Sequence, residues 1–152
     1  MATVEVAFTP LPAHVRTARL VATAVARRSG VDEALLDEVR LAVGEACSRA
    51  VEAHRRHCPA EPVRIEMTDQ GERFVVVVRD SAPGAAGTQA AEASAPSAAA
   101  NGAGVPYSAD DDAIPAGFGL AVISGLADDV RVSSTSSGVS VQMSWPSASA
   151  TA

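Results

Sequence analysis

The chain has 152 residues, of which 47% are hydrophobic and only 3% aromatic, and its formal net charge at pH 7 is −6. One domain of this size can bury a core, which must be built from aliphatic side chains because aromatic rings are scarce. The negative charge argues against nonspecific binding to nucleic acid or to an anionic membrane, since both need clustered positive charge.

The first 30 residues predict a strand followed by a helix. Residues 2–8 alternate well enough for a strand, and the Pro-Leu-Pro sequence at 10–12 ends it. Pro12 fits the first turn of a helix, where its missing N–H costs nothing. The helical pattern continues to Ser29, and Gly30 is the expected stop after the helix.

A second, longer helix is predicted over residues 33–56, with Asp32 as its N-cap. Its apolar positions recur at helical spacing, and two prolines, Pro59 and Pro62, end the pattern. Cys47 lies at an apolar position and is expected to be a small, reduced core residue. With Cys58 it forms neither a disulfide framework nor a metal-ligand set. The apolar positions are Leu36, Val39, Val43, Ala46 and Ala50.

The second half of the chain predicts strands at 63–69 and 73–80, a helix at 117–129 and a closing hairpin of strands at 130–135 and 139–146. Trp145 is expected to be a packing residue in the last strand. Between the two parts, residues 81–116 are rich in Ala, Gly, Ser and Pro and carry the acidic run at 110–112. A loop of this length inside a domain is usually functional or disordered.

This order of elements predicts an α+β fold: a two-layer α/β sandwich in which three helices cover one face of a mainly antiparallel sheet. We expect one domain over residues 1–146 and a disordered tail at 147–152. No apolar run approaches a membrane span, and the N-terminus lacks the features of a signal peptide, so a cytoplasmic protein is expected.

Glu45 and Arg49 lie four residues apart on the second helix and therefore share one face. The residues alone favour an exposed ion-pair ladder, since Glu52 and Arg56 continue the same spacing. The alternative is a functional pair facing a pocket. The three histidines lack metal-ligand spacing and are expected at the surface; they are His14, His54 and His57.

Two further segments, one at the end of a strand and one at the start of a helix, contain candidate binding residues. Asp80 ends a buried strand just before a Pro-Gly turn, and an Asp there can bind an amino group such as that of adenine. Gly117 and Gly119 open a helix directly after the long loop, where backbone N–H groups can approach a phosphate. Each signal is weak by itself, whereas their order and spacing together are more specific.

Together these segments resemble the histidine-kinase-like ATPase domain of the GHKL, or Bergerat-fold, superfamily. Within it, the chain is similar to bacterial anti-sigma factors that are also serine-protein kinases. The likeness is carried by "VDEALLDEVRLAVGEACSRAVEA", which resembles the N-box helix, by "VVVVRDSAPG", which resembles the first glycine box, and by "GFGLAVISGLADDVRV", which resembles the second.

The resemblance implies a role for each matching residue. Glu45 would be the general base, Asp80 the residue that binds adenine, and residues 81–116 an ATP-lid-like loop. Arg16 and Arg19 on the first helix would contact protein partners. The nucleotide-binding residues would be Arg49, Asp80, Ala82, Gly84, Gly117, Phe118, Gly119 and Leu120.

Two positions depart from the family pattern. Arg49 stands where the N-box has an Asn that coordinates Mg²⁺, and a guanidinium has no acceptor atom for a metal. Arg49 can instead contact the phosphates or pair with Glu45. Ala82 replaces the first Gly of the first glycine box and can crowd the nucleotide. We therefore expect ATP as the cofactor and weakened Mg²⁺ binding, with no metal held by the protein's own residues.

The resemblance implies a regulator that sequesters a sigma factor, or that binds and phosphorylates a STAS-domain anti-anti-sigma factor on Ser or Thr. Homodimers are common in such families. The alternative is a non-catalytic interaction module of the same fold that has lost Mg²⁺-dependent phosphoryl transfer. Arg49 is the residue that separates these two hypotheses.

Overall fold

The computed structural model describes residues 2–82 and 116–148, and these ranges contain the helices and strands in the predicted order. The helix after the long loop ends earlier than expected, because Asp129 already pairs with Ser144 as the first residue of the next strand. The elements are β1 Ala2–Phe8, α1 Pro12–Arg28, α2 Glu33–His57, β2 Val63–Asp69, β3 Arg73–Arg79, α5 Ala116–Leu126, β4 Asp129–Thr135 and β5 Gly138–Pro146.

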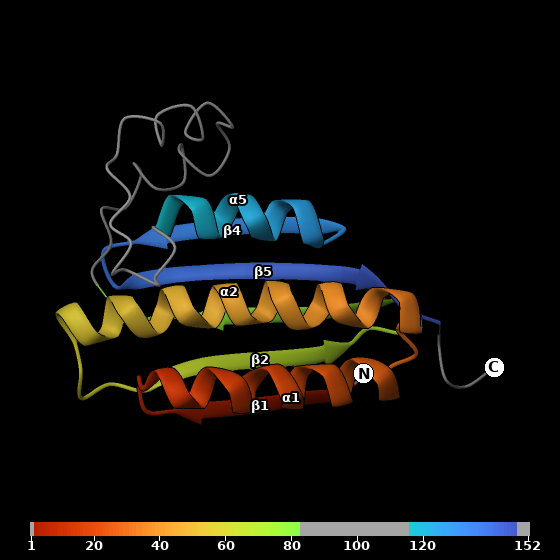
Figure 1. Cartoon of the computed structure of the whole chain (residues 1–152), viewed down its shortest axis with the longest axis horizontal. Helices are drawn as coiled ribbons and strands as arrows, with labels where there is room; N and C mark the ends of the chain where they lie inside the picture. Colours follow the sequence, from red (N-terminus) through yellow and green to blue (C-terminus); the bar gives the residue numbers. More distant parts are fainter. Residues whose placement is uncertain (1, 83–115, 149–152) are drawn as a thin grey trace.

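The strands form one sheet in the order β1-β2-β3-β5-β4, and each neighbouring pair is antiparallel. In the central strand β3, Val76 lies opposite Met67 of β2 and Met143 of β5. Helices α1, α2 and α5 cover one face of this sheet (Figure 1), with α2 between the other two. The predicted two-layer α+β sandwich is therefore confirmed.

The core between the two layers is aliphatic, as the composition requires. All five apolar positions predicted on α2 are buried, and Cys47 is fully buried with them. Trp145 is 1% exposed and its indole N–H donates to the Leu126 carbonyl at 3.1 Å, so it joins β5 to the end of α5.

The opposite face of the sheet is polar except at Val75 and Val77 of the central strand β3. Cross-strand pairs join Arg79 to Glu66, with N and O atoms 2.7 Å apart, and Arg64 to Glu5 at 3.6 Å. Such cross-strand pairs of opposite charge suit a face that contacts water, and each adds little stability.

The ends of the two long helices follow the predicted signals. Gly30, at φ 88°, donates to the Arg27 carbonyl, and Val31 donates to the Ala26 carbonyl, which is the Schellman arrangement. The Asp32 carboxylate accepts a hydrogen bond from the Ala34 N–H at 2.9 Å. Neither these helices nor α5 combines the length and apolarity that crossing a membrane would require, which holds for the described residues only.

Candidate functional site

Arg49 and Asp80 form a buried ion pair where the C-terminal half of α2 passes the end of β3. Arg49 Nη1 lies 3.2 Å from Asp80 Oδ2, and the two side chains are 6% and 2% exposed. The exposed-ladder interpretation is therefore wrong for Arg49. It is right for the next turn, where Arg56 Nε lies 3.1 Å from Glu52 Oε1 near the surface. The pairing of Arg49 with Glu45 is also not seen among the described residues, where Glu45 is half-buried.

Asp80 is fixed between β3 and β5 by its backbone and by its other carboxylate oxygen. Oδ1 accepts hydrogen bonds from the N–H groups of Ala82, at 3.1 Å, and Val139, at 3.2 Å. The Asp80 N–H donates to the Val139 carbonyl at 2.9 Å. Gly138 allows this approach, because a Cβ at its position, where φ is 147°, would collide with the Asp80 carbonyl.

His54 supports the same corner and is not a surface residue, which corrects the sequence-based expectation. It is fully buried; Nδ1 bonds to the Glu61 carbonyl at 2.8 Å, and Nε2 accepts the Ser81 N–H at 2.8 Å. The two backbone groups require a neutral ring with its proton on Nδ1. The signal was present in the sequence, since His54 continues the apolar stripe one turn after Ala50.

The residues of the two glycine boxes are only partly within the described ranges. Ala82 is 3% exposed next to Asp80, and Leu120 is 6% exposed on α5, which packs against α2. Gly117, Phe118 and Gly119 lie in the first turn of α5. Gly84, most of the lid-like loop and the acidic run at 110–112 lie outside the described residues. So does the tail after residue 148, whereas Ser147 and Ala148 donate to the Glu72 and Gly30 carbonyls.

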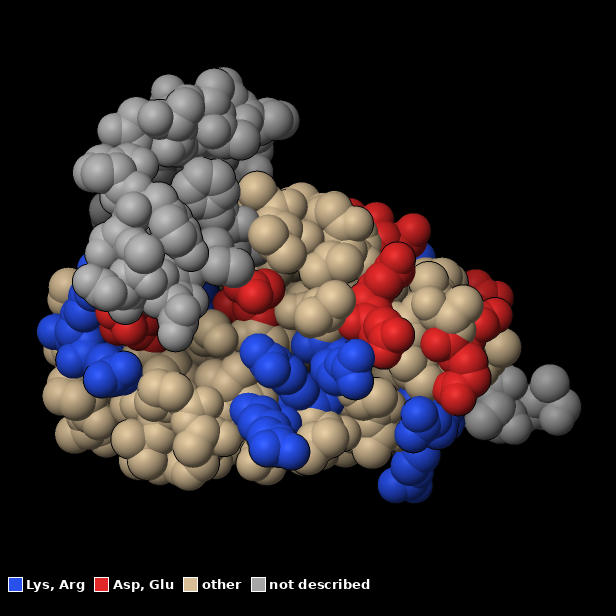
Figure 2. Space-filling view, in the orientation of Figure 1, with Lys and Arg blue, Asp and Glu red and all other residues tan. Residues whose placement is uncertain are grey.

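The two arginines predicted to contact partners lie on α1 beside α2. Arg16 is exposed, and Arg19 is half-buried over Gly44, where a Cβ would collide with Arg19 Nε. Figure 2 shows arginine side chains gathered over the middle of these two helices. Arg19 forms no ion pair with any described residue, and its buried Nε has no hydrogen-bond acceptor there. The buried Nε–H therefore lacks the hydrogen bond that buried donors normally make.

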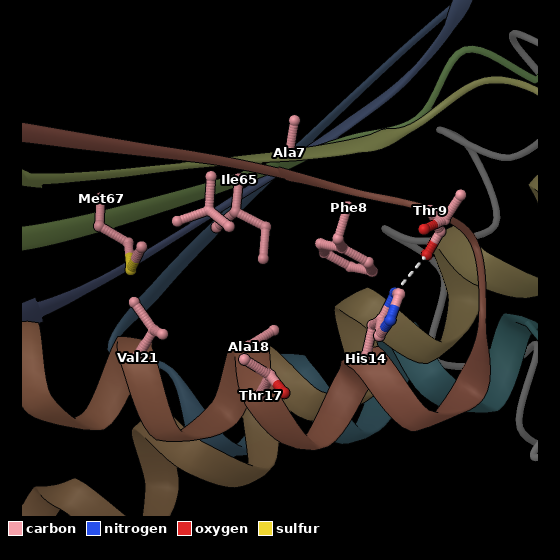
Figure 3. A pocket seen from close by; sticks show the side chains of 10 residues that line it. Ala7, Phe8, Thr9, His14, Thr17, Ala18, Val21, Ile65 and Met67 are labelled. Carbon is pink, nitrogen blue, oxygen red and sulfur yellow. Dashed lines mark hydrogen bonds between the residues drawn. The ribbon is translucent and has the colours of Figure 1, made fainter.

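A cavity of about 370 Å³ opens between β1 and α1 (Figure 3). Its lining is mainly apolar, and small side chains such as Thr17 and Ala18 leave the space. His14 at its edge bonds through Nδ1 to the Thr9 carbonyl at 3.0 Å. None of the lining residues belongs to the Arg49–Asp80 corner, so this cavity is separate from the candidate site.

Both cysteines should react slowly with a thiol reagent in the folded protein. Burial raises the pKa of Cys47 to about 12, an effect that the positive charge of Arg19 opposes. Partial burial, and then the negative charges of Glu61 and Asp80, raise the pKa of Cys58. A raised pKa keeps the thiol protonated, and the thiolate is the reactive form.

At pH 8, we expect Ellman's reagent to modify Cys58 slowly and Cys47 only after unfolding in guanidinium chloride. A Cys58→Ala variant should show no reactive thiol until it unfolds. Rapid modification of that variant in buffer would contradict the buried position of Cys47.

The sequence model of one family, described as the histidine kinase-like ATPase domain, matches residues 8–145. No curated protein sequence matches the chain. The matched range begins at the end of β1 and runs to the last residues of β5, so it includes Glu45, Arg49 and Asp80 together with α5.

Proposed function

Because the chain belongs to the histidine kinase-like ATPase domain family, we propose that it is an ATP-binding regulator of the anti-sigma-factor type. It would act by binding a sigma factor or a STAS-domain antagonist through α1 and the neighbouring part of α2. Family membership supports ATP binding, and the identity of the partner is our proposal. The chain would act in the cytoplasm, with no direct contact to nucleic acid, and a homodimer is compatible with this role.

The observation that carries the proposal is the state of Arg19. Its guanidinium lies over Gly44, half-buried and without an ion-pair partner among the described residues. A carboxylate or carbonyl of a protein partner would pair with the accessible part of this guanidinium and would fit the basic surface that Arg16 extends. The exposed Leu20 and Leu41, at 61% and 49%, add apolar area on the same two helices. Arginine beside exposed aliphatic residues is typical of protein interfaces.

The residues of the nucleotide site match only part of what a protein kinase would need. Bound ATP would supply a phosphoryl group, and the half-buried Glu45 could accept the proton of an attacking hydroxyl. However, Mg²⁺ needs oxygen ligands, and Arg49 offers none at the position where the family pattern has an amide. The buried Arg49–Asp80 pair therefore favours a second candidate: a regulator of the same fold that binds partners without phosphorylating them.

Binding assays with purified candidate partners test the proposal. We expect the wild-type chain to bind one of the sigma factors or STAS-domain proteins encoded by the same genome. Arg19→Ala should weaken this binding at least about tenfold, because a charged hydrogen bond at an interface is worth about 1.5–3 kcal/mol. Gly44→Ala should have a similar effect although Arg19 is retained, because the added methyl group displaces its guanidinium.

The matched control is Arg28→Ala, which removes an exposed arginine from the far end of α1. It should leave the affinity within about twofold of wild type if Arg19 acts by position and not by net charge. Equal losses for Arg19→Ala and Arg28→Ala would argue against a defined contact. If no sigma factor or STAS-domain protein binds, the proposed function is wrong.

A further inference from the structure

We propose that the Arg49 guanidinium blocks Oδ2 of Asp80, the hydrogen-bond acceptor through which Asp80 would recognise a nucleotide base. A base can then bind only by displacing Arg49. This inference rests on the proposed nucleotide site, and it concerns a contact that the family pattern does not contain, since the pattern has a short amide at this position.

The hydrogen bonds of Asp80 show which of its atoms could serve a ligand. Oδ1 is already bonded to two backbone N–H groups, from Ala82 and Val139, which hold the end of β3 against β5. Oδ2 is therefore the atom left for the exocyclic amine of a base, and Arg49 Nη1 bonds to it at 3.2 Å. The guanidinium donates the same kind of N–H hydrogen bond that the amine would donate.

Burial makes the two donors compete. Only 2% of the Asp80 side chain and 6% of the Arg49 side chain are exposed. The pair is therefore almost entirely enclosed, and Arg49 is the side-chain donor that lies against Oδ2. Under the proposal, a base reaches Oδ2 only when the guanidinium moves away.

Because of the contact between Arg49 and Asp80, the buried carboxylate has a partner in the absence of nucleotide. A buried carboxylate without a partner is unfavourable, so an empty site of this kind would normally gain from a ligand. Here Arg49 provides Asp80 with an opposite charge and with a hydrogen bond to Oδ2.

Calorimetry with ATP in EDTA tests the competition without any contribution from Mg²⁺. We expect Arg49→Met to bind ATP at least about tenfold more tightly than wild type, because the variant exposes Oδ2. The double variant Arg49→Met/Asp80→Asn should lose this gain. Inosine triphosphate lacks the exocyclic amine and should show no gain with Arg49→Met, which distinguishes release of the acceptor from the loss of a positive charge.

Several results would overturn the inference. These are equal ATP affinity of wild type and Arg49→Met, an equal gain for inosine triphosphate, or no ATP binding by a folded Arg49→Met. Partner binding, measured on the same proteins, reports separately on the proposed function, because it depends on Arg19.

If Arg49→Met does not fold, the wild-type chain still gives an answer through the NMR signal of the Arg49 side-chain Nε–H. Under the proposal this signal shifts as ATP saturates the site. Saturation with an unchanged signal would contradict displacement.

Discussion

Replacing Arg49 by Met should lower the free energy of unfolding by about 3–5 kcal/mol, the cost typical of leaving one member of a buried ion pair alone. Asp80 would remain inside the protein with its Oδ2 facing an apolar side chain, and only its Oδ1 would keep the bonds to Ala82 and Val139. Asp80→Asn should be costly for the related reason that the buried Arg49 then loses its ion pair with the Asp80 carboxylate. Urea or guanidinium denaturation measures both effects.

The double variant Arg49→Met/Asp80→Asn distinguishes pairing from packing. Because it contains no isolated buried charge, we expect it to be more stable than Arg49→Met alone, so that the two costs are strongly non-additive. The control is the exposed pair on the next turn of α2, where Glu52→Gln/Arg56→Met should change stability by no more than about 0.5 kcal/mol. Additive costs at Arg49 and Asp80 would mean that the two side chains do not depend on each other.

Much of the fold could be predicted because its signals are local. The period of apolar residues on α2, the N-cap Asp32 and the glycine after α1 each depend on neighbours within a few residues. Alternation in β2 and the continuous valines of β3 distinguish a half-buried strand from a central one. The order of these elements then leaves few architectures, and the antiparallel sheet with helices on one face is among them.

The contact at the centre of the candidate site could not be predicted in the same way. Spacing along the helix pointed to Glu45 as the partner of Arg49, whereas the observed partner is 31 residues away in the chain. Arg49 reaches Asp80 only because α2 lies over the end of β3, and helical periodicity does not report such tertiary neighbours. The family resemblance located both residues at one site, but it offered only the phosphates or Glu45 as partners for Arg49. An arginine in place of the shorter amide side chain bonds to the acidic residue itself.

His54 was expected at the surface because it is a histidine, although its position continues the apolar stripe of α2. Its substitution should have the second large effect on stability. His54→Leu should destabilise the protein by about 2–4 kcal/mol, because the Glu61 carbonyl and the Ser81 N–H each lose a buried partner. Leu fills a similar volume, so the cost reports the two hydrogen bonds more than a cavity. Denaturant unfolding gives the magnitude.

Amide hydrogen exchange locates the effect of His54→Leu. The Ser81 amide should exchange faster in this variant, since its acceptor is the His54 ring. His57→Leu is the matched control on the exposed side of the same helix, and it should change stability by less than about 0.5 kcal/mol. Unchanged protection at Ser81 together with wild-type stability would contradict the role of His54. Because Ser81 directly follows Asp80, faster exchange there would mean that His54 holds in place the backbone on which the Arg49–Asp80 pair depends.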